Sequence, residues 1–187
     1  MPKAVVLFAS PHRSGATARL LTRFLSGLQG DWQTDTFDVC VDPVHPCMAC
    51  GVCKEKDGCA FRDLDVFDAS LRESDLLIIA SPVYNFSFPA QLKSVIDRFQ
   101  RYFEARFSRG VHPAIERPRR AVLLLTMGQK DPFAVEVCEK TLRQSFSVMN
   151  TTLAGTVCLM NTDSGVNGED AAFEKAYKLA IEITAEV

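Results

Sequence analysis

The chain has 187 residues, the size of one domain, and 47% of them are apolar, which is enough for a substantial core. The formal net charge is −2 with no run of like charges, which argues against a nucleic-acid or membrane partner. The apolar stretches are too short to span a bilayer and the N-terminus does not resemble a signal peptide, so we expect one cytoplasmic domain, residues 1–187.

Five short apolar segments alternate along the chain with longer segments of helical periodicity. The first apolar segment is a nearly continuous run of Val, Leu and Phe, as expected for a strand buried on both faces. The predicted strands are 4–9, 34–41, 76–80, 121–125 and 153–160. The predicted helices are 18–28, 63–73, 89–103, 133–149 and 169–186. Loops are expected at 43–62, which is rich in cysteine, and at 110–119.

This alternation predicts an α/β protein, a three-layer sandwich with helices on both faces of a parallel sheet. Five strands favour the order 2-1-3-4-5 over the six-stranded dinucleotide-binding order. In such a sheet the ligand binds where the strand order reverses. The loops after the first, third and fourth strands are therefore expected to form the site.

The loop after the first strand, residues 10–17, has the composition of a phosphate site. It combines hydroxyl side chains and a glycine with a helix N-terminus, whose N–H groups and dipole attract anions. Arg13 and His12 can add positive charge. The loop lacks both the Walker ending and the GxGxxG pattern, which argues against a dinucleotide held in Rossmann fashion. An alternative is that Ser14 or Thr17 only caps the helix.

The loop after the third strand, residues 81–89, is long, aromatic and fixed by prolines. It can offer backbone amides and a flat apolar surface to a planar ring, as an isoalloxazine requires. In the turn after the fourth strand, Gly128 permits close backbone approach and Gln129 can hydrogen-bond the polar edge of a flavin. The alternative is that the aromatic side chains only cover the end of the sheet and that the turn is an ordinary one.

Residues 10–17 resemble the Ser-Pro-Arg-x-x-Gly-Asn-Thr phosphate loop of the NADPH-dependent FMN reductase and iron–sulfur flavoprotein group. Residues 81–98 are similar to the second signature of that family, and the order and spacing fit over roughly the first two-thirds of the chain. The resemblance implies a flavodoxin-like fold and bound FMN. It also implies a homodimer or homotetramer in which a neighbouring subunit helps to enclose the flavin.

The resemblance places two groups of residues at the cofactor. The phosphate positions are Ser10, Arg13, Ser14 and Thr17. The isoalloxazine positions are Pro82, Val83, Tyr84, Asn85 and Phe86. We add as cofactor-binding residues His12, Ala16, Thr126, Gly128 and Gln129. No side chain is assigned as a catalytic acid or base.

Four of the seven cysteines fall within thirteen residues: Cys47, Cys50, Cys53 and Cys59. Four thiolates on one compact segment suit a [4Fe–4S] cluster, and their spacing resembles the motif of the iron–sulfur flavoproteins. Structural zinc competes with this interpretation, although zinc sites with four cysteines usually join two distant CxxC pairs. Free or oxidised thiols are the third alternative. We expect the remaining cysteines to be small core residues: Cys40, Cys138 and Cys158.

Two redox functions follow from these motifs. An FMN-dependent oxidoreductase would take hydride from NAD(P)H and reduce a flavin, a quinone or a similar small acceptor. An iron–sulfur flavoprotein would instead relay single electrons from a ferredoxin-like donor through a [4Fe–4S] cluster to FMN, and the complete set of four cysteines favours it. A non-redox binding module is disfavoured by the phosphate loop and by the aromatic loop 84–88.

Overall fold

In the computed structural model, which describes residues 1–164 and 169–185, five strands form one parallel sheet in the order β2-β1-β3-β4-β5. The predicted fold class and strand order are confirmed. The strands are β1 (Lys3–Phe8), β2 (Gln33–Asp38), β3 (Leu76–Pro82), β4 (Arg119–Thr126) and β5 (Thr151–Leu159).

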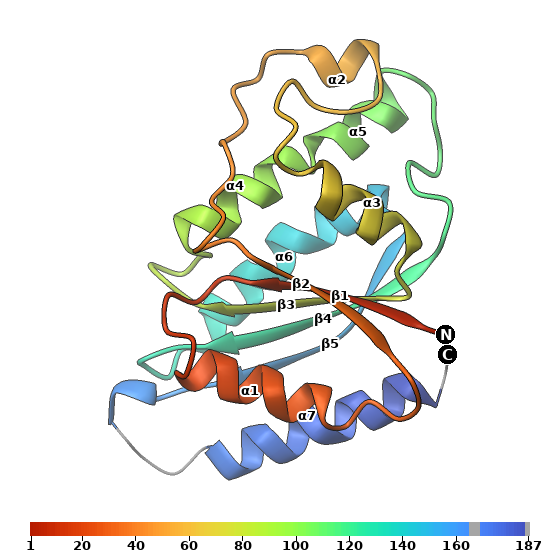
Figure 1. Ribbon diagram of the computed structural model, residues 1–187. Coiled ribbons are helices and arrows are strands. Elements are labelled where there is room, and N and C mark those ends of the chain that lie inside the picture. Colours follow the sequence, from red (N-terminus) through yellow and green to blue (C-terminus); the bar gives the residue numbers. More distant parts are fainter. Residues whose placement is uncertain (165–168, 186–187) are drawn as a thin grey trace.

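Helices cover both faces of this sheet (Figure 1). The first face carries α1 (Ala16–Leu25) and α7 (Glu169–Thr184). The opposite face carries α3 (Asp65–Glu73), α4 (Ala90–Arg98), α5 (Gln100–Phe107) and α6 (Pro132–Val148). Two short elements complete the described chain, α2 (Val52–Glu55) in the cysteine loop and the 3-10 helix η1 (Thr162–Ser164). In the described parts of the chain, no helix combines the length and apolar character needed to cross a membrane.

The central strands are buried on both faces, which explains their nearly continuous apolar sequences. Because successive strand residues point to opposite faces, Val5 and Leu7 pack beneath α3–α6, whereas Val6 packs against α1 and α7. On α1, Leu20 and Phe24 are fully buried in the apolar core between the sheet and helices α1 and α7. Burial of each such side chain contributes about 1.5–3 kcal/mol.

Strand β2 ends three residues earlier than the sequence predicts. The carboxylate of Asp38 accepts hydrogen bonds from the N–H groups of Cys40 at 3.0 Å and Val41 at 3.2 Å, which turns the chain out of the sheet. Cys40 therefore lies half-buried in this turn, so its assignment to the core is wrong. Cys138 is fully buried, and Cys158 packs half-buried against the core. Burial raises the pKa of these two thiols to about 11 and about 12.

The helix predicted over 89–103 is two helices, α4 and α5, that meet at a turn at Phe99 and continue to Phe107. The sequence reading ended the segment too early because charged residues interrupt its apolar pattern. In the structure Arg101 and Glu104 are buried, at 8% and 6% exposure. Charged side chains thus belong to the inner face of α5, where periodicity expects apolar ones.

Candidate functional site

Three loops meet at Thr126, the last residue of β4. Its backbone carbonyl accepts a hydrogen bond from the Val83 N–H at 2.8 Å, which joins the loop after β3 to the end of β4. Its Oγ1 lies 2.8 Å from Oγ1 of Thr17, which joins the start of α1 to the same point. The loops after β1, β3 and β4 therefore converge at the carboxyl edge of the sheet, at the left of Figure 1. This is where the strand order predicts a ligand.

The N-terminus of α1 begins without a capping side chain. The capping position belongs to Gly15, so the alternative in which Ser14 or Thr17 caps the helix is wrong. A Cβ at Gly15 would lie 3.0 Å from Cβ of His12 and 3.2 Å from its carbonyl oxygen, so this tight turn favours glycine. The first turn of α1 also holds no acidic residue. Helix N–H groups in this arrangement form an anion site, which fits the phosphate of a flavin nucleotide.

Two of the predicted phosphate residues, Ser10 and Arg13, have partners within the chain. The Ser10 hydroxyl accepts a hydrogen bond from the His12 N–H at 3.2 Å and stabilises its own turn. The Arg13 guanidinium extends to the end of β2, where its Nη2 lies 3.0 Å from the Asp38 carboxylate. Together with Ser14 it lines a groove of about 450 Å³ along α1. Arg13 and Ser14 thus line a different groove from the predicted ring contacts.

The predicted ring contacts line one cavity of about 580 Å³. They are Val83, Tyr84, Asn85, Phe86, Gly128 and Gln129. Pro82 and Thr126 do not line this cavity. They are paired at the ends of β3 and β4, directly before the residues that do. The volume falls in the range of small-molecule sites, and aromatic and polar side chains share the wall. The cavity therefore fits a flavin ring in size and chemistry.

A tight turn presents the aromatic side chains to this cavity. Tyr84 and Ser87 exchange two backbone hydrogen bonds of 2.9 Å, and the two residues between them are left-handed, Asn85 at φ 49° and Phe86 at φ 61°. A left-handed phenylalanine is strained by about 1–2 kcal/mol. The side chains of Tyr84 and Phe86 are 46% and 49% exposed, so the interpretation that they only fill the core is wrong for these two. It holds for Phe88, which is buried.

Sequence reasoning missed Asp163 as part of the cavity. This residue lies in η1, after β5, and its carboxylate packs against the backbone of Gly128. A Cβ at Gly128 would lie only 2.5 Å from Cγ of Asp163, so the backbone approaches this exposed side chain closely, and a larger residue at 128 would displace it. The predicted strand order could have identified Asp163. It places β5 beside β4, and this brings the loop after β5 to the same edge of the sheet. The rest of that polar loop, 165–168, lies outside the described residues.

The four clustered cysteines line a second cavity, of about 420 Å³, between the cysteine loop and helices α4 and α5. Left-handed residues Ala49, Gly51 and Gly58 fold the loop around it. All four thiols are free, and burial raises the pKa of Cys53, with Glu104 and neighbouring thiols adding to the effect. Within residues 1–164 and 169–185, no three His, Cys, Asp or Glu side chains already form a metal-binding group. The donor set nevertheless fits a [4Fe–4S] cluster in number and chemistry, because four thiols share one cavity.

His45 lies near the start of this loop. Its ring stacks on Phe61, with centroids 4.4 Å apart, and its Nδ1 lies 2.9 Å from Oδ2 of Asp63. Burial alone would raise the pKa of Asp63, but hydrogen bonds from the His45 N–H and the Arg98 guanidinium outweigh it and lower the pKa to about 2. Asp63 is therefore ionised at neutral pH.

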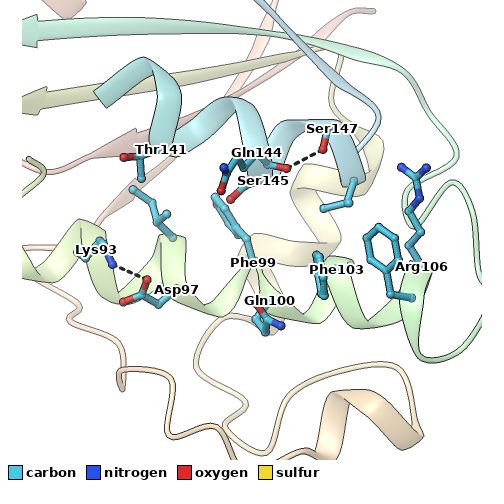
Figure 2. A pocket seen from close by; sticks show the side chains of 13 residues that line it. Lys93, Asp97, Phe99, Gln100, Phe103, Arg106, Thr141, Gln144, Ser145 and Ser147 are labelled. Carbon is cyan, nitrogen blue, oxygen red and sulfur yellow. Dashed lines mark hydrogen bonds and ion pairs between the residues drawn. The ribbon is translucent and has the colours of Figure 1, made fainter. Parts of the chain in front are cut away.

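A third cavity, of about 650 Å³, lies between α4, α5 and α6 (Figure 2). At one end Nζ of Lys93 forms an exposed ion pair with Asp97, at 2.6 Å. At the other end the rings of Phe103 and Phe107 are 43% and 61% exposed, with centroids 4.4 Å apart. The cofactor residues predicted from the sequence lie elsewhere. Two exposed aromatic rings and a largely polar set of side chains thus line this groove.

A parallel sheet of this order, with three loops meeting at its carboxyl edge, is the architecture of flavodoxin-like proteins, which bind FMN at that edge. The sequence profile of the NADPH-dependent FMN reductase family matches residues 2–164, so the chain belongs to that family. FMN is accordingly its cofactor, and the chain is a flavoprotein of an oxidoreductase family.

Two curated relatives are iron–sulfur flavoproteins. The protein from Methanosarcina thermophila is 41% identical over 68 residues, which is 36% of either chain. The protein from Archaeoglobus fulgidus is 33% identical over 102 residues, which is 54% of this chain and 46% of the relative. The chain thus spans less than half the length of these relatives. Among solved structures, an NAD(P)H:quinone oxidoreductase from Methanothermobacter marburgensis has the same fold, with TM-score 0.70, 18% identity, and coverage of 97% of this chain and 94% of that one.

Proposed function

We propose that this chain is an FMN-dependent oxidoreductase that takes hydride from NAD(P)H and reduces a small acceptor such as a flavin or a quinone. One observation carries the proposal. Helix α1 begins without a capping side chain at the edge where the loops after β1, β3 and β4 meet. The family profile and the name of the similar quinone oxidoreductase support the choice of donor and acceptor.

Each part of the site has a role in this proposal. The first N–H groups of α1 hold the phosphate, and the hydroxyl of Ser14 adds a donor. Exposed rings of Tyr84 and Phe86 contact a planar ligand, and the amide of Gln129 hydrogen-bonds its polar edge. Bound FMN supplies the hydride chemistry, while the protein orients the ring and leaves one face open. No acid or base side chain is needed for this reaction.

Substitutions at Ala16, the first residue of α1, test the phosphate site. Ala16→Asp places a negative charge beside the bound phosphate, and we expect FMN affinity to fall at least tenfold. The charge interacts favourably with the helix dipole by about 0.3–1 kcal/mol, while the larger side chain disturbs the packing of half-buried Ala16 against the core. The matched control, Ala16→Asn, has the same shape without the charge. Equal FMN affinity of the two variants in a flavin-fluorescence titration would place the phosphate away from α1.

Hydride transfer from the nicotinamide is tested separately. We expect the FMN-loaded protein to take deuterium from only one face of specifically labelled NADPH or NADH. Analysis of the oxidised nicotinamide by mass spectrometry measures this stereospecificity. Reduction by ferredoxin without detectable reduction by either nicotinamide would reject NAD(P)H as the donor.

A specific observation favours a second function, that of an iron–sulfur flavoprotein. All four clustered cysteines line one cavity, and both relatives described above are named iron–sulfur flavoproteins. We assign as ligands Cys47, Cys50, Cys53 and Cys59. A [4Fe–4S] cluster held there would supply one-electron transfer from a ferredoxin-like donor.

Iron and acid-labile sulfide in protein purified without oxygen test this second function. We expect about four irons per chain. Cys50→Ser should lose iron, whereas Cys40→Ser, in the turn after β2, should retain it. Iron-free protein, or equal iron in both variants, would reject the iron–sulfur function and leave only the nicotinamide-dependent one.

We also propose that residues 1–187 act as one cytoplasmic domain that assembles into a homodimer or homotetramer. The groove between α4, α5 and α6, with exposed Phe103 and Phe107, is the face proposed for the second copy. Light scattering measures the mass in solution, and we expect Phe107→Glu to shift it toward the monomer. An unchanged oligomer mass would exclude this face.

A further inference from the structure

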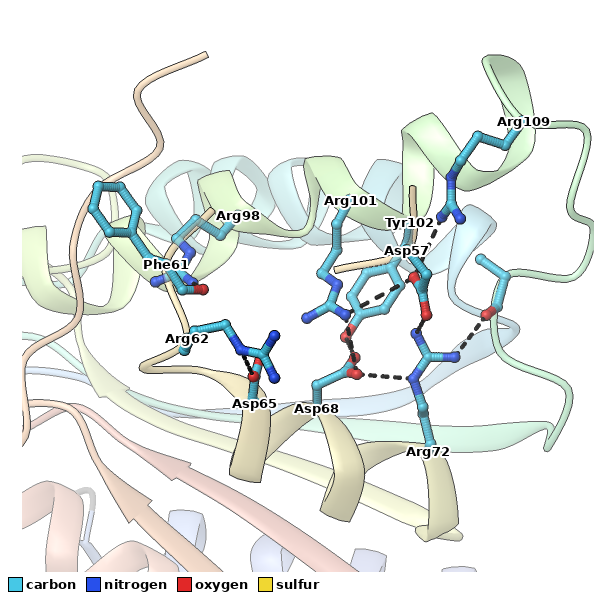
Figure 3. A network of polar contacts seen from close by, with 11 residues as sticks. Asp57, Phe61, Arg62, Asp65, Asp68, Arg72, Arg98, Arg101, Tyr102 and Arg109 are labelled. Carbon is cyan, nitrogen blue, oxygen red and sulfur yellow. Dashed lines mark hydrogen bonds and ion pairs between the residues drawn. The ribbon is translucent and has the colours of Figure 1, made fainter. Parts of the chain in front are cut away.

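One buried arginine holds both ends of the cysteine loop. The side chain of Arg98, from the end of α4, is 1% exposed. Its Nη2 donates to the Phe61 carbonyl at 2.9 Å, and its Nη1 donates to the His45 carbonyl at 3.4 Å and pairs with Asp63. His45 precedes the four cysteines and Phe61 follows them, so a single guanidinium fixes the entry and exit of the loop. Figure 3 shows Arg98 beside Phe61, at the exit.

A second buried arginine lies one turn further along, in α5. Nη2 of Arg101 is 3.2 Å from the carboxylate of Asp68 in α3 and 3.9 Å from that of Asp57 in the cysteine loop. Figure 3 shows its side chain extending from α5 towards these carboxylates. Asp57 and Asp68 also pair with Arg72, and Asp57 pairs with Arg109. The loop is therefore joined to α3 and α5 by a shared network of charges.

This network carries more positive than negative charge. Among the described residues, four guanidinium groups share three carboxylates: Arg72, Arg98, Arg101 and Arg109 with Asp57, Asp63 and Asp68. Elsewhere on the cavity wall lie the cation of Lys54 and the carboxylates of Glu104 and Asp97, and Asp97 is paired with the cation of Lys93. The fixed charge around the cysteine cavity is thus net positive, in a chain whose overall charge is negative.

The two arginines also carry buried N–H groups for which the described part of the chain provides no partner. Nε of Arg98 and Nε of Arg101 are buried and have no hydrogen-bond partner among the described residues. The two residues are 3% and 8% exposed, and both line the cavity that the cysteines line. A buried N–H without an acceptor is destabilising, and native proteins rarely keep one without a reason. Among the described residues, Arg109 and Arg119 also carry buried unpaired N–H groups, and neither lines the cavity, so it is the net positive charge above that favours an anionic occupant.

We infer that Arg101 is a positioning residue that fits the cysteine cavity to an anionic metal–thiolate centre and raises its reduction potential, with Arg98 holding the loop beneath it. The inference rests on the iron–sulfur function proposed above. Four thiolates around a [4Fe–4S] core leave a net negative charge that grows by one unit when an electron is accepted. A fixed positive charge nearby stabilises the reduced form more than the oxidised form.

Arg101→Met tests this role and leaves the other ion pairs of the network in place. Asp68 keeps Arg72 and the Tyr102 hydroxyl, which donates to it at 2.5 Å, and Asp57 keeps Arg72 and Arg109. Arg101→Lys retains the charge and serves as the conservative variant. Arg106→Met is the matched control, because Arg106 lies on the same helix, stacks on Phe107 and lines the other groove (Figure 2).

The measurement is a potentiometric titration of the oxygen-free holoprotein, monitored by electron paramagnetic resonance. At a fixed potential we expect Arg101→Met to lower the ratio of reduced to oxidised cluster about tenfold, which is 59 mV for one electron. Arg101→Lys and Arg106→Met should stay within about twofold of the wild type. The FMN potential, read from the visible spectrum, should not change and serves as the internal reference.

Each outcome has a defined meaning. Unchanged cluster potential in Arg101→Met, at equal iron content, would overturn the inference. Loss of the cluster from Arg101→Met but not from Arg101→Lys supports it, because charge is then what retains the anionic centre. Loss from both variants would overturn it in favour of a purely structural role for the guanidinium. Absence of iron and sulfide from the wild type would instead reject the iron–sulfur function itself.

Discussion

Replacing Thr126 with valine removes a buried hydroxyl and keeps the shape of the side chain. Its Oγ1 lies 2.8 Å from Oγ1 of Thr17, and the two residues are 4% and 3% exposed. A buried hydroxyl that loses its partner costs about 1–3 kcal/mol. We therefore expect Thr126→Val and Thr17→Val each to lower the free energy of unfolding by about 1–2 kcal/mol. The double variant leaves neither hydroxyl unpaired and should lie within about 1 kcal/mol of the wild type.

Urea unfolding of the FMN-free proteins measures the free energy of unfolding of the wild type, the two single variants and the double variant. In a chain of this size, each kcal/mol corresponds to about 2–4 °C in melting temperature, which gives an independent readout. FMN titration adds the functional consequence, because Thr126 joins the loops proposed to form the FMN site. We expect weaker FMN binding in Thr126→Val as the junction loosens. If the two losses of stability simply add in the double variant, the hydroxyls do not pair and the reasoning is refuted.

Three further predictions concern the cavity edge and the cysteine loop. Gly128→Ala puts a Cβ 2.5 Å from Cγ of Asp163, an exposed side chain that can rotate away, so urea unfolding should show a loss of less than about 1 kcal/mol, which Asp163→Ala removes. Because the pKa of Asp63 is lowered to about 2 in the folded protein, its stabilisation is complete above about pH 4 and lost as pH falls towards 2. Allowing for solvent screening this is about 1–2 kcal/mol, and Asp63→Asn should flatten the acid-unfolding curve over that window. Phe86→Gly releases a left-handed φ of 61° and should stabilise the fold by about 1 kcal/mol, while loss of the ring weakens FMN binding in a flavin titration.

The sheet and the meeting of its loops could be predicted because both follow from local patterns. Continuous apolar strands separated by helical segments allow few topologies, and the order 2-1-3-4-5 fixes which loops share an edge. Composition then identified residues 81–89 and 126–130 as the wall of the ring cavity. The structure brings six of the predicted residues to that wall.

What could not be predicted depends on pairs distant in the sequence. The Thr17 hydroxyl could equally cap its helix, bind phosphate or pair with Thr126, which lies 109 residues away. Arg98 and Arg101 carry charges typical of a solvent-facing side, and their burial depends on carboxylates of the cysteine loop and α3. Periodicity detects apolar faces and does not detect ion pairs, so it could not predict which face of α5 is buried.

The two outer strands of the sheet differ from the inner ones in a way that affects how the protein behaves at high concentration. At the β4–β5 border the register shifts, because Ala121 pairs with Leu153 but Val122 pairs with Gly155, which leaves Ala154 as an extra residue in the edge strand. The opposite edge, β2, carries two aspartates in six residues. Bulges and charges on outer strands hinder a foreign strand from extending the hydrogen-bonded ladder. Fibrous aggregation by strand addition is thereby disfavoured at both margins of the sheet.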